Sequence, residues 1–371
     1  MSPTSTSTAG VLAGSFSSKL FLRHLRTAEL GRRLHWLNVT ESTMRVGQDL
    51  LDEAFPFRAP GPGAPPPGGA AAVAGLLIGA DSQTAGVART AGRSWDSAGA
   101  GATEPALLAP GNPDAGSRGN LYVTLLLVVP RPETLMQMLP AAASATVLAA
   151  RDALRSVTGS PAGLGTTADG WSGSLEPVLK WPNDVWIGGR KCAGMLARSS
   201  MLPNGAGFGV MIGVGINVNN VPEVISSPSA MRAFSSRPTS LREQAFHAPG
   251  SGDFIPRELV LASFLNHLED LLSRPMAHTI TTMQGLDCAV GRRLLISPSY
   301  VPHSSTPAPV AESDRGAGAA AGLLPPGAFE AIGMSISPLG ELVVRNTATG
   351  QVTTLASSEE ISIRPMPGSA A

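Results

Sequence analysis

The stretch that decides the fold reads Lys-Trp-Pro-Asn-Asp-Val-Trp-Ile-Gly-Gly-Arg-Lys-Cys-Ala-Gly-Met-Leu over residues 180–196. Two apolar runs separated by Gly-Gly predict a β-hairpin. Pro182 cannot donate to a central ladder, so we expect the incoming strand to break there. The break leaves three polar side chains at a sheet end, those of Lys180, Asn183 and Asp184. A cation, an amide and a carboxylate suit a phosphate and its Mg²⁺; the alternative is a solvated lysine beside a turn-forming Asn-Asp pair.

The composition is that of a chain of two or three domains interrupted by loops. Its 371 residues include 27 Lys+Arg and 27 Asp+Glu, so no basic excess indicates a nucleic-acid partner. The 42 Gly and 32 Pro are concentrated in a few stretches, so part of the length is loop. Cys192 and Cys288 fit neither a disulfide framework nor a zinc pattern, which predicts reduced thiols in an intracellular protein. No apolar run reaches the ~18 residues of a membrane span, and no membrane partner is expected.

The N-terminal residues 1–18 are rich in Ser, Thr and Ala, and basic residues precede the first acidic one, Glu29. That composition is typical of a transit peptide into a chloroplast or mitochondrion. The alternative is a disordered tail followed by a helix over 20–34, which leaves cytoplasm and organelle both open. A helix-turn-helix module needs at least two further helices ahead of the first motif, so we expect no DNA-binding domain.

Two segments before residue 96 have the features of ligand-binding loops. A strand over 35–39 leads to Ser42 and Thr43, which cap a helix and form a small polar pocket, although most such caps are structural. A strand over 76–78 then leads into a loop of small residues over 80–95 that contains Arg89 and Arg93. Small residues let backbone N–H groups approach a phosphate, and arginine adds a two-pronged charge. A plain surface loop is equally compatible, and the Gly-Lys-Ser/Thr ending of a P-loop is absent.

The central part of the chain predicts two long strands and a helix. Residues 122–129 form one apolar run, and a helical segment over 134–151 contains Pro140, which is expected to open the main helix at its first turn. Residues 208–218 alternate, with one apolar face and one nearly bare face made of Gly209, Met211, Gly213, Gly215 and Asn217. Something must lie close against the bare face, either a packed helix or strand or a flat ligand such as a nucleotide base.

The C-terminal part predicts a core helix over 256–272 and then a small β-barrel. Its short alternating strands lie at 288–296, 329–335, 341–346, 351–355 and 360–364. Low-complexity composition predicts disordered insertions at about 53–74, 98–117, 159–174 and 297–327.

Taken in order, these motifs resemble those of the biotin–protein ligases (holocarboxylase synthetases). The matching segments are Ser42-Thr43, the 83–95 loop, Gly119-Asn120-Leu121, the 180–184 block, Lys191 with Ala193-Gly194, and 213–217. The lead-in over 30–36 is most similar to plant-type members, and the resemblance covers about 30–272. It implies an α+β fold, with a mixed central β-sheet flanked by helices, as in class II aminoacyl-tRNA synthetases, and a small C-terminal β-barrel. The expected domains are a catalytic domain over 19–275 and a second domain over 276–371.

The resemblance also implies a two-step reaction. Biotin attacks the α-phosphate of Mg·ATP to give biotinyl-5′-adenylate, and a lysine of a biotin carboxyl carrier domain, such as that of acetyl-CoA carboxylase, then takes the biotinyl group. The implied catalytic residues are Lys191 and Arg89. The implied biotin-binding residues are Ser42, Thr43, Gln83, Gly86, Lys191 and Gly194. The implied ATP- and adenylate-binding residues are Arg89, Arg93, Trp95, Lys180, Asn183, Asp184 and Asn217, with Asn183 also a magnesium ligand.

The glycine-rich loop departs from the family pattern Gly-Arg-Gly-Arg. Val87 and Ala88 replace the first Arg and the Gly, and one extra residue precedes Trp95. Counting from Gly86 makes Arg89 the phosphate arginine, which we favour, whereas counting back from Trp95 selects Thr90. Two alternatives therefore stay open, a lipoate- or octanoyl-transferring relative and a biotin-binding protein with impaired catalysis.

Overall fold

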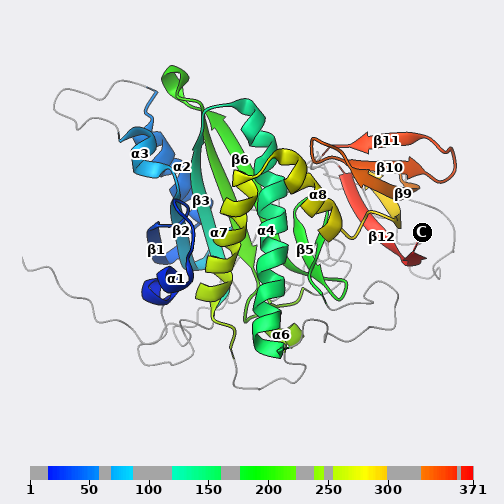
Figure 1. The fold of residues 1–371 in the computed structure, drawn as a ribbon, viewed down its shortest axis with the longest axis horizontal. Coiled ribbons are helices and arrows are strands. Elements are labelled where there is room, and N and C mark those ends of the chain that lie inside the picture. The colour runs from blue at the N-terminus through cyan, green and yellow to red at the C-terminus, as the bar shows by residue number, and fades with distance from the viewer. Residues whose placement is uncertain are drawn as a thin grey trace, which may run out of the picture.

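A seven-stranded mixed sheet forms the body of the molecule in a computed structural model (Figure 1). The structure describes residues 16–57, 68–86, 119–159, 176–222, 238–245, 254–298, 327–356 and 361–370. In spatial order the strands are β1 (Arg33–Thr40), β2 (Leu76–Gln83), β3 (Leu121–Val129), β7 (Phe208–Ile216), β6 (Arg190–Met201), β5 (Asp184–Ile187) and β4 (Val178–Lys180). β1 and β2 pair in parallel and the other neighbours pair antiparallel, which confirms the predicted mixed sheet.

Helices cover both faces of this sheet. On one face α4 (Pro132–Thr158) packs beside α7 (Arg257–Ser273), with α1 (Ser18–His24) against α7 and α8 (Met276–Leu286) against α4 (Figure 1). The main hydrophobic core lies between these helices and the sheet. On the other face lie α2 (Thr43–Ala54) and α3 (Gly69–Val73), above a smaller core around Met44, Leu51 and Met211. Two short elements complete this part, η1 (Pro203–Gly205) and α6 (Leu241–Ala245).

The hairpin predicted from the 180–196 stretch is confirmed. β4 ends at Lys180, a turn holds Pro182, and β5 begins at Asp184. Gly188 and Gly189 have φ values of 55° and 71°, the left-handed pair that a two-residue hairpin turn requires. The break at the proline and the turn at the glycines are both local effects, which is why they could be read from the residues.

The bare face of β7 is covered by a helix over part of its length. A Cβ on Gly213 would lie 2.7 Å from Met44 Sδ, and one on Gly209 would lie 3.2 Å from a Leu51 methyl. Both neighbours belong to α2, so the packed-helix interpretation is correct at these two glycines. The lack of side chains on β7 lets α2 lie close to the sheet.

Pro140 does not open a helix, contrary to the prediction. α4 starts at Pro132, in its first turn, and continues through Pro140 to Thr158. A proline inside a helix removes one hydrogen bond and costs about 3 kcal/mol. The tertiary packing offsets this cost, because Pro140 is one of fourteen buried residues of this helix.

The helix expected over 20–34 is also wrong, since α1 ends at His24. The Glu269 carboxylate on α7 accepts from the backbone N–H groups of Ala28, Glu29 and Leu30 and holds them in a turn. Gly31 follows with φ of 72°, and β1 begins at Arg33. The competing partner for these N–H groups lies 239 or more residues away in sequence, beyond the reach of a local pattern.

Three boundaries differ from those expected. The described fold begins at Phe16, whose ring stacks on Trp36 at 3.7 Å, and not after residue 18. Part of the expected 53–74 insertion is ordered, as the end of α2 and as α3 with the buried Val73. β2 runs on to Gln83, so the loop begins later than residue 80. The expected insertion at 98–117, and nearly all of those at 159–174 and 297–327, lie outside the described residues.

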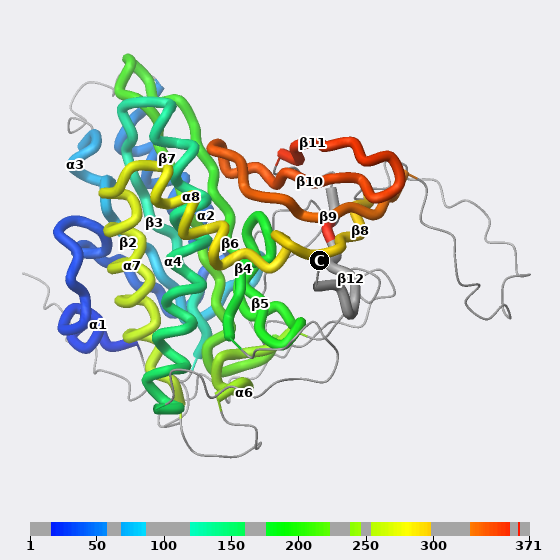
Figure 2. The backbone as a smooth tube through the Cα atoms, turned by 45° about the vertical axis from the view of Figure 1, so that its right-hand side comes forward, coloured from blue at the N-terminus to red at the C-terminus, as the bar shows by residue number. Residues whose placement is uncertain are grey.

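The small C-terminal β-domain is present beside the body of the molecule (Figure 2). Its strands are β8 (Arg292–Pro298), β9 (Phe329–Ile336), β10 (Leu342–Asn346), β11 (Val352–Leu355) and β12 (Ile361–Ala370). They form an antiparallel sheet in the order β11-β10-β9-β8-β12. Over the described residues the predicted small β-barrel is therefore an open sheet, with β11 and β12 at its two edges. Over the described part of the chain, none of the helices combines the length and the apolar character that a membrane crossing requires.

Candidate functional site

The candidate site lies on the α2 face of the main sheet, past the N-terminus of α2. The strand register places four residues opposite one another across β5, β6, β7 and β3, namely Asp184, Gly194, Gly215 and Tyr122. Directly opposed residues share a face, and Gly215 is two residues from Gly213, so this row faces the same side as α2. Two adjacent glycines in the row leave flat backbone, where a ligand can approach closely.

A β-bulge brings Lys191 onto this face. The pairing of β5 with β6 passes from Val185–Ala193 to Trp186–Lys191, so Cys192 has no opposite residue. The extra residue shifts the alternation, and Lys191 emerges on the same face as Asp184. Lys191 Nζ lies 2.7 Å from Asp184 Oδ1, and both side chains are about a quarter or less exposed. The ion pair thus holds a cation in place beside the glycine row.

Two other predicted residues lie close to this pair. Lys180 is opposite Asp184 on the neighbouring strand, and its Nζ lies 4.9 Å from the ring centroid of Trp186. Asn183 is buried and donates its Nδ2 hydrogen to Met195 O at 2.6 Å, which sets the direction of its amide oxygen. We call Lys180, Asn183, Asp184 and Lys191 the hairpin cluster.

A neutral, buried group of residues lies at the N-terminus of α2. Gln83 Oε1 accepts from both the backbone N–H and the hydroxyl of Thr43, at 2.8 and 3.1 Å. Thr124 donates its hydroxyl hydrogen to Thr43 Oγ1 at 2.9 Å. Ser42 is the N-cap residue, yet its Oγ is buried and has no hydrogen-bond partner among the described residues. We call Ser42, Thr43, Gln83 and Thr124 the hydroxyl cluster.

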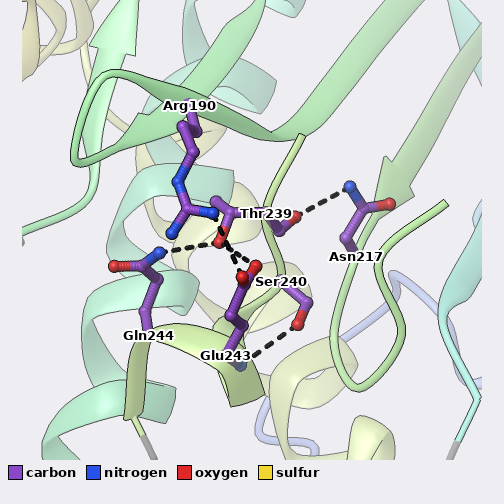
Figure 3. Close-up of polar contacts among 6 residues, drawn as sticks. All are labelled: Arg190, Asn217, Thr239, Ser240, Glu243 and Gln244. Carbon is purple, nitrogen blue, oxygen red and sulfur yellow. Dashed lines mark hydrogen bonds and ion pairs between the residues drawn. The ribbon is translucent and has the colours of Figure 1, made fainter. Parts of the chain in front are cut away.

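Asn217, just past the end of β7, is positioned by a loop at residues 238–240 (Figure 3). Its Nδ2 donates to Thr239 O at 3.0 Å, while its buried Oδ1 has no partner within the described part of the chain. The backbone N–H of Thr239 donates to Lys191 O at 2.9 Å. Thr239 is therefore hydrogen-bonded both to Asn217 after the end of β7 and to Lys191 near the start of β6.

The side chain of Thr239 is held in turn by a charged network (Figure 3). Its hydroxyl donates to Glu243 Oε2 at 2.9 Å and accepts from Gln244 Nε2 at 2.7 Å. Glu243 Oε1 also pairs with Arg190 Nη1 at 3.1 Å. The Glu243 backbone N–H donates to Ser240 Oγ, the arrangement that a Ser-x-x-Glu capping box predicts at 240–243. These residues were not predicted from the sequence to be part of the site, and the capping box was the available signal.

The surroundings of the two thiols near the site disfavour the thiolate form. Burial raises the pKa of the Cys192 and Cys288 thiols well above the usual value, and both cysteines are free. The thiol of Cys192 points to Asn217 O at 3.6 Å, so it packs inside the sheet. The charged groups that can act on a substrate in the hairpin cluster are the Lys180 and Lys191 amines and the Asp184 carboxylate.

The structure brings together most of the predicted site residues. Those it places around the glycine row or at the start of α2 are Ser42, Thr43, Gln83, Lys180, Asn183, Asp184, Lys191, Gly194 and Asn217. Gly86 is the last described residue of the loop after β2, and Arg89, Arg93 and Trp95 lie outside the described residues. Two unpartnered oxygens, Ser42 Oγ and Asn217 Oδ1, remain as buried acceptors that a bound ligand would satisfy.

Comparisons with known proteins find similarity to ligases of biotin and lipoate. Residues 115–217 match the model of the biotin/lipoate A/B protein ligase family. The chain is 27% identical over 261 residues to the bifunctional ligase/repressor BirA of Bacillus subtilis, which covers 70% of this chain and 60% of that relative. It is 33% identical over 81 residues to the biotin–[acetyl-CoA-carboxylase] ligase of Paracoccus denitrificans, 21% of this chain and 30% of that one.

A solved structure has the same fold. It is a variant of the biotin protein ligase from Aquifex aeolicus in complex with biotin, with a TM-score of 0.51 and 18% identity over 91% of this chain and all of that one. This likeness concerns the fold alone. The chain is thus similar to biotin protein ligases in fold, and in sequence over the segments that these relatives match.

Proposed function

We propose that this protein is an ATP-dependent biotin–protein ligase that acts on the biotin carboxyl carrier domain of a carboxylase of the acetyl-CoA carboxylase type. The observation that supports this most directly is the Lys191–Asp184 pair beside the Gly194–Gly215 row. A fixed cation above bare backbone is what two anionic substrates need in order to meet. The Paracoccus relative, named biotin–[acetyl-CoA-carboxylase] ligase, supports the choice of substrates.

In the first step a carboxylate oxygen of biotin attacks the α-phosphorus of ATP. The bond from that phosphorus to the oxygen bridging to the β-phosphate breaks, and pyrophosphate leaves with the electron pair. Lys191 faces both the carboxylate and the α-phosphate, and its charge stabilises the negative charge that gathers on the phosphate oxygens. Asp184 keeps the ammonium in position before the substrates bind.

The hydroxyl cluster is assigned to the ureido ring of biotin. A cyclic urea offers one carbonyl acceptor and two N–H donors, and Ser42 Oγ, Thr43 and Gln83 supply matching neutral groups in a buried setting. Asn217 Oδ1 is assigned to the nucleotide, as a buried acceptor for an N–H or O–H donor. Arg89, Arg93 and Trp95 complete the adenylate side in this proposal, on the strength of the sequence resemblance.

In the second step the amine of the carrier lysine attacks the acyl carbon of biotinyl-5′-adenylate. An amide bond forms, AMP leaves, and the amine loses a proton to solvent or to a nearby base. The ammonium of Lys191 again lies beside the leaving phosphate and favours its departure.

Magnesium is assigned to the ATP and not to a site made by the protein alone. Within the described residues no group of three or more His, Cys, Asp or Glu side chains could hold a metal ion. Asn183 and Asp184 provide one amide oxygen and one carboxylate, and Mg²⁺ usually combines such a limited set with substrate phosphates and water. The metal would neutralise phosphate charge when it arrives with ATP.

The remaining parts of the proposal rest on sequence. These parts are that the protein is a plant-type ligase, that it has no nucleic-acid or membrane partner, and that it is located in the cytoplasm or an organelle.

The test is biotin-dependent exchange of labelled pyrophosphate into ATP, by the wild type and by Lys191→Ala. We expect exchange in the wild type and loss of most of it in the variant. Lipoate and octanoate in place of biotin test the lipoate alternative, which would lead if either supported faster exchange. A folded wild type that binds biotin in calorimetry but shows no exchange would be a biotin-binding protein.

A further inference from the structure

The turn of the Lys-Trp-Pro-Asn-Asp motif is attached to the C-terminal part of the chain. Asp287 is the first residue after α8, in the connection that leads to the C-terminal sheet. Its Oδ2 accepts from the Trp181 backbone N–H at 3.0 Å. Its Oδ1 accepts from the N–H groups of Ala289 and Val290 at 2.7 and 3.2 Å. One partly buried carboxylate thus joins two segments separated by 106 residues.

The same joint is supported on both sides of the carboxylate. The Cys288 N–H donates to Leu179 O at 2.8 Å, so residues 287–288 extend the main sheet beyond its edge strand β4. The indole N–H of Trp181 donates to Gly340 O at 2.9 Å, in the turn between β9 and β10. Trp181 is therefore held through its backbone by Asp287 and through its ring by the C-terminal sheet.

The position of this turn decides where two residues of the hairpin cluster lie. Asn183 is two residues after Trp181 and is bonded to β6 through Met195 at both its backbone O and its Nδ2. Asp184 follows and holds Lys191. Asp287 anchors the opposite end of the turn, because its Oδ2 accepts the hydrogen bond of the Trp181 backbone N–H.

We propose that Asp287 is a positioning residue for the ATP side of the site: its carboxylate fixes the turn at 181–183 against the C-terminal sheet, so that Asn183 and Asp184 are in place before ATP binds. This inference rests on the proposed function. Asp287 touches neither substrate, and it acts through the turn. On the biotin side, at the N-terminus of α2, the hydrogen bonds described above join Thr43, Gln83 and Thr124 to one another.

The test uses Asp287→Asn in the full chain. Asparagine keeps an oxygen that accepts from the Ala289 and Val290 N–H groups, but it presents an NH₂ group to the Trp181 N–H. Only the hydrogen bond from Trp181 is therefore lost. We expect the KM for ATP in pyrophosphate exchange to rise by up to about tenfold, the ordinary effect of one lost hydrogen bond. The kcat and the Kd for biotin should stay within about twofold to threefold, because the biotin side is unchanged.

A matched control is Gln284→Ala. Gln284 Oε1 accepts from the Ile336 N–H at 3.0 Å, so it also ties α8 to the C-terminal sheet, but it does not contact the turn. This variant should leave the KM for ATP within twofold. An equal rise of the KM for ATP in both variants would overturn the proposal, because the effect would then come from a weaker attachment of the C-terminal sheet in general. Asp287→Ser, which can keep the local turn but cannot reach Trp181, should reproduce the Asn result and replaces that variant if it does not fold.

Hydrogen exchange supplies a readout that does not depend on activity. The Trp181 amide should exchange about tenfold faster or more in Asp287→Asn than in the wild type, since its acceptor is gone. Unchanged exchange in a folded variant would refute the role of Asp287. If the wild type shows no biotin-dependent activity, the proposed function fails, and amide exchange together with ATP binding by calorimetry still decides whether Asp287 positions the turn.

Discussion

The hydroxyl cluster at the start of α2 is neutral and buried, whereas the hairpin cluster is charged and partly exposed. Ser42, Thr43 and Gln83 are each 6% exposed or less, while Lys191 and Asp184 keep 24% and 20%. The difference follows from desolvation, because burying a charged group costs far more free energy than burying a neutral polar group. The neutral side can therefore be built in advance. The charged hairpin cluster stays partly exposed to solvent, and its electrostatic attraction for the substrates increases when a bound substrate excludes water.

The largest test of this comparison removes the cation. Lys191→Ala should lower kcat/KM for biotin-dependent exchange by about 30-fold to 1,000-fold, by analogy with the ~2–4 kcal/mol lost when an oxyanion donor is deleted. The Kd for biotin should change less than the rate. Arg198→Ala is the control, because Arg198 lies on the same strand and is exposed. An equal loss of kcat/KM in both variants would show that removing any charge from strand β6 lowers the rate, and that Lys191 has no specific role.

The second test breaks the neutral side. Thr43→Val keeps the shape of the side chain and removes its hydroxyl, which serves both Gln83 and Thr124. The Kd for biotin should rise about tenfold to a hundredfold, with kcat little changed, because a buried acceptor loses its donor. Calorimetry measures the Kd. Thr124→Val, one bond further from the pocket, should have the smaller effect, and the reverse order would contradict the assignment of the hydroxyl cluster to biotin.

A smaller effect is expected from the network that supports Thr239. Glu243→Gln weakens the partly exposed pair with Arg190, a contact of the class worth about 0.2–1 kcal/mol. The KM for ATP should rise by a few-fold at most, and less at high salt, because Thr239 positions Asn217 and Lys191 through backbone bonds that remain. A change in the Kd for biotin of similar size would mean that this network serves both sides of the site.

The pH dependence of stability sharpens the role of Asp287. Burial, the largest cause, raises the pKa of this carboxyl to about 7 from 3.8, although its three N–H donors lower it. Because the folded state then binds the proton more tightly than the unfolded state, this residue stabilises the fold fully below pH 3.8. That contribution is lost as the pH rises towards 7.

Urea unfolding at pH 5 and pH 7.5 measures this effect. Asp287→Asn should show a smaller loss of unfolding free energy over the interval than the wild type, since the other titrating groups are common to both. Identical losses in the two proteins would place the pH dependence elsewhere.

Much of the fold could be predicted because its signals are local. Pro182 ends β4, Gly188 and Gly189 form the hairpin turn, and the alternation over 208–216 forms β7. The residue types of the site were also visible, since the hairpin cluster lies within twelve consecutive residues. The prediction failed at Pro140, where burial in a long helix outweighed a local preference.

The sequence by itself determined which residues could bind anions, where strands start and end, and that a mixed sheet would precede a small β-domain. Only the tertiary structure decided which way these residues face. A bulge at Cys192 turns Lys191 towards Asp184, Thr239 comes from a distant loop to hold Asn217, and Asp287 reaches Trp181 across 106 residues. The physical reason is range: dihedral preferences and side-chain alternation act within a few residues, whereas strand register and hydrogen-bond partners depend on segments that meet only in the folded chain.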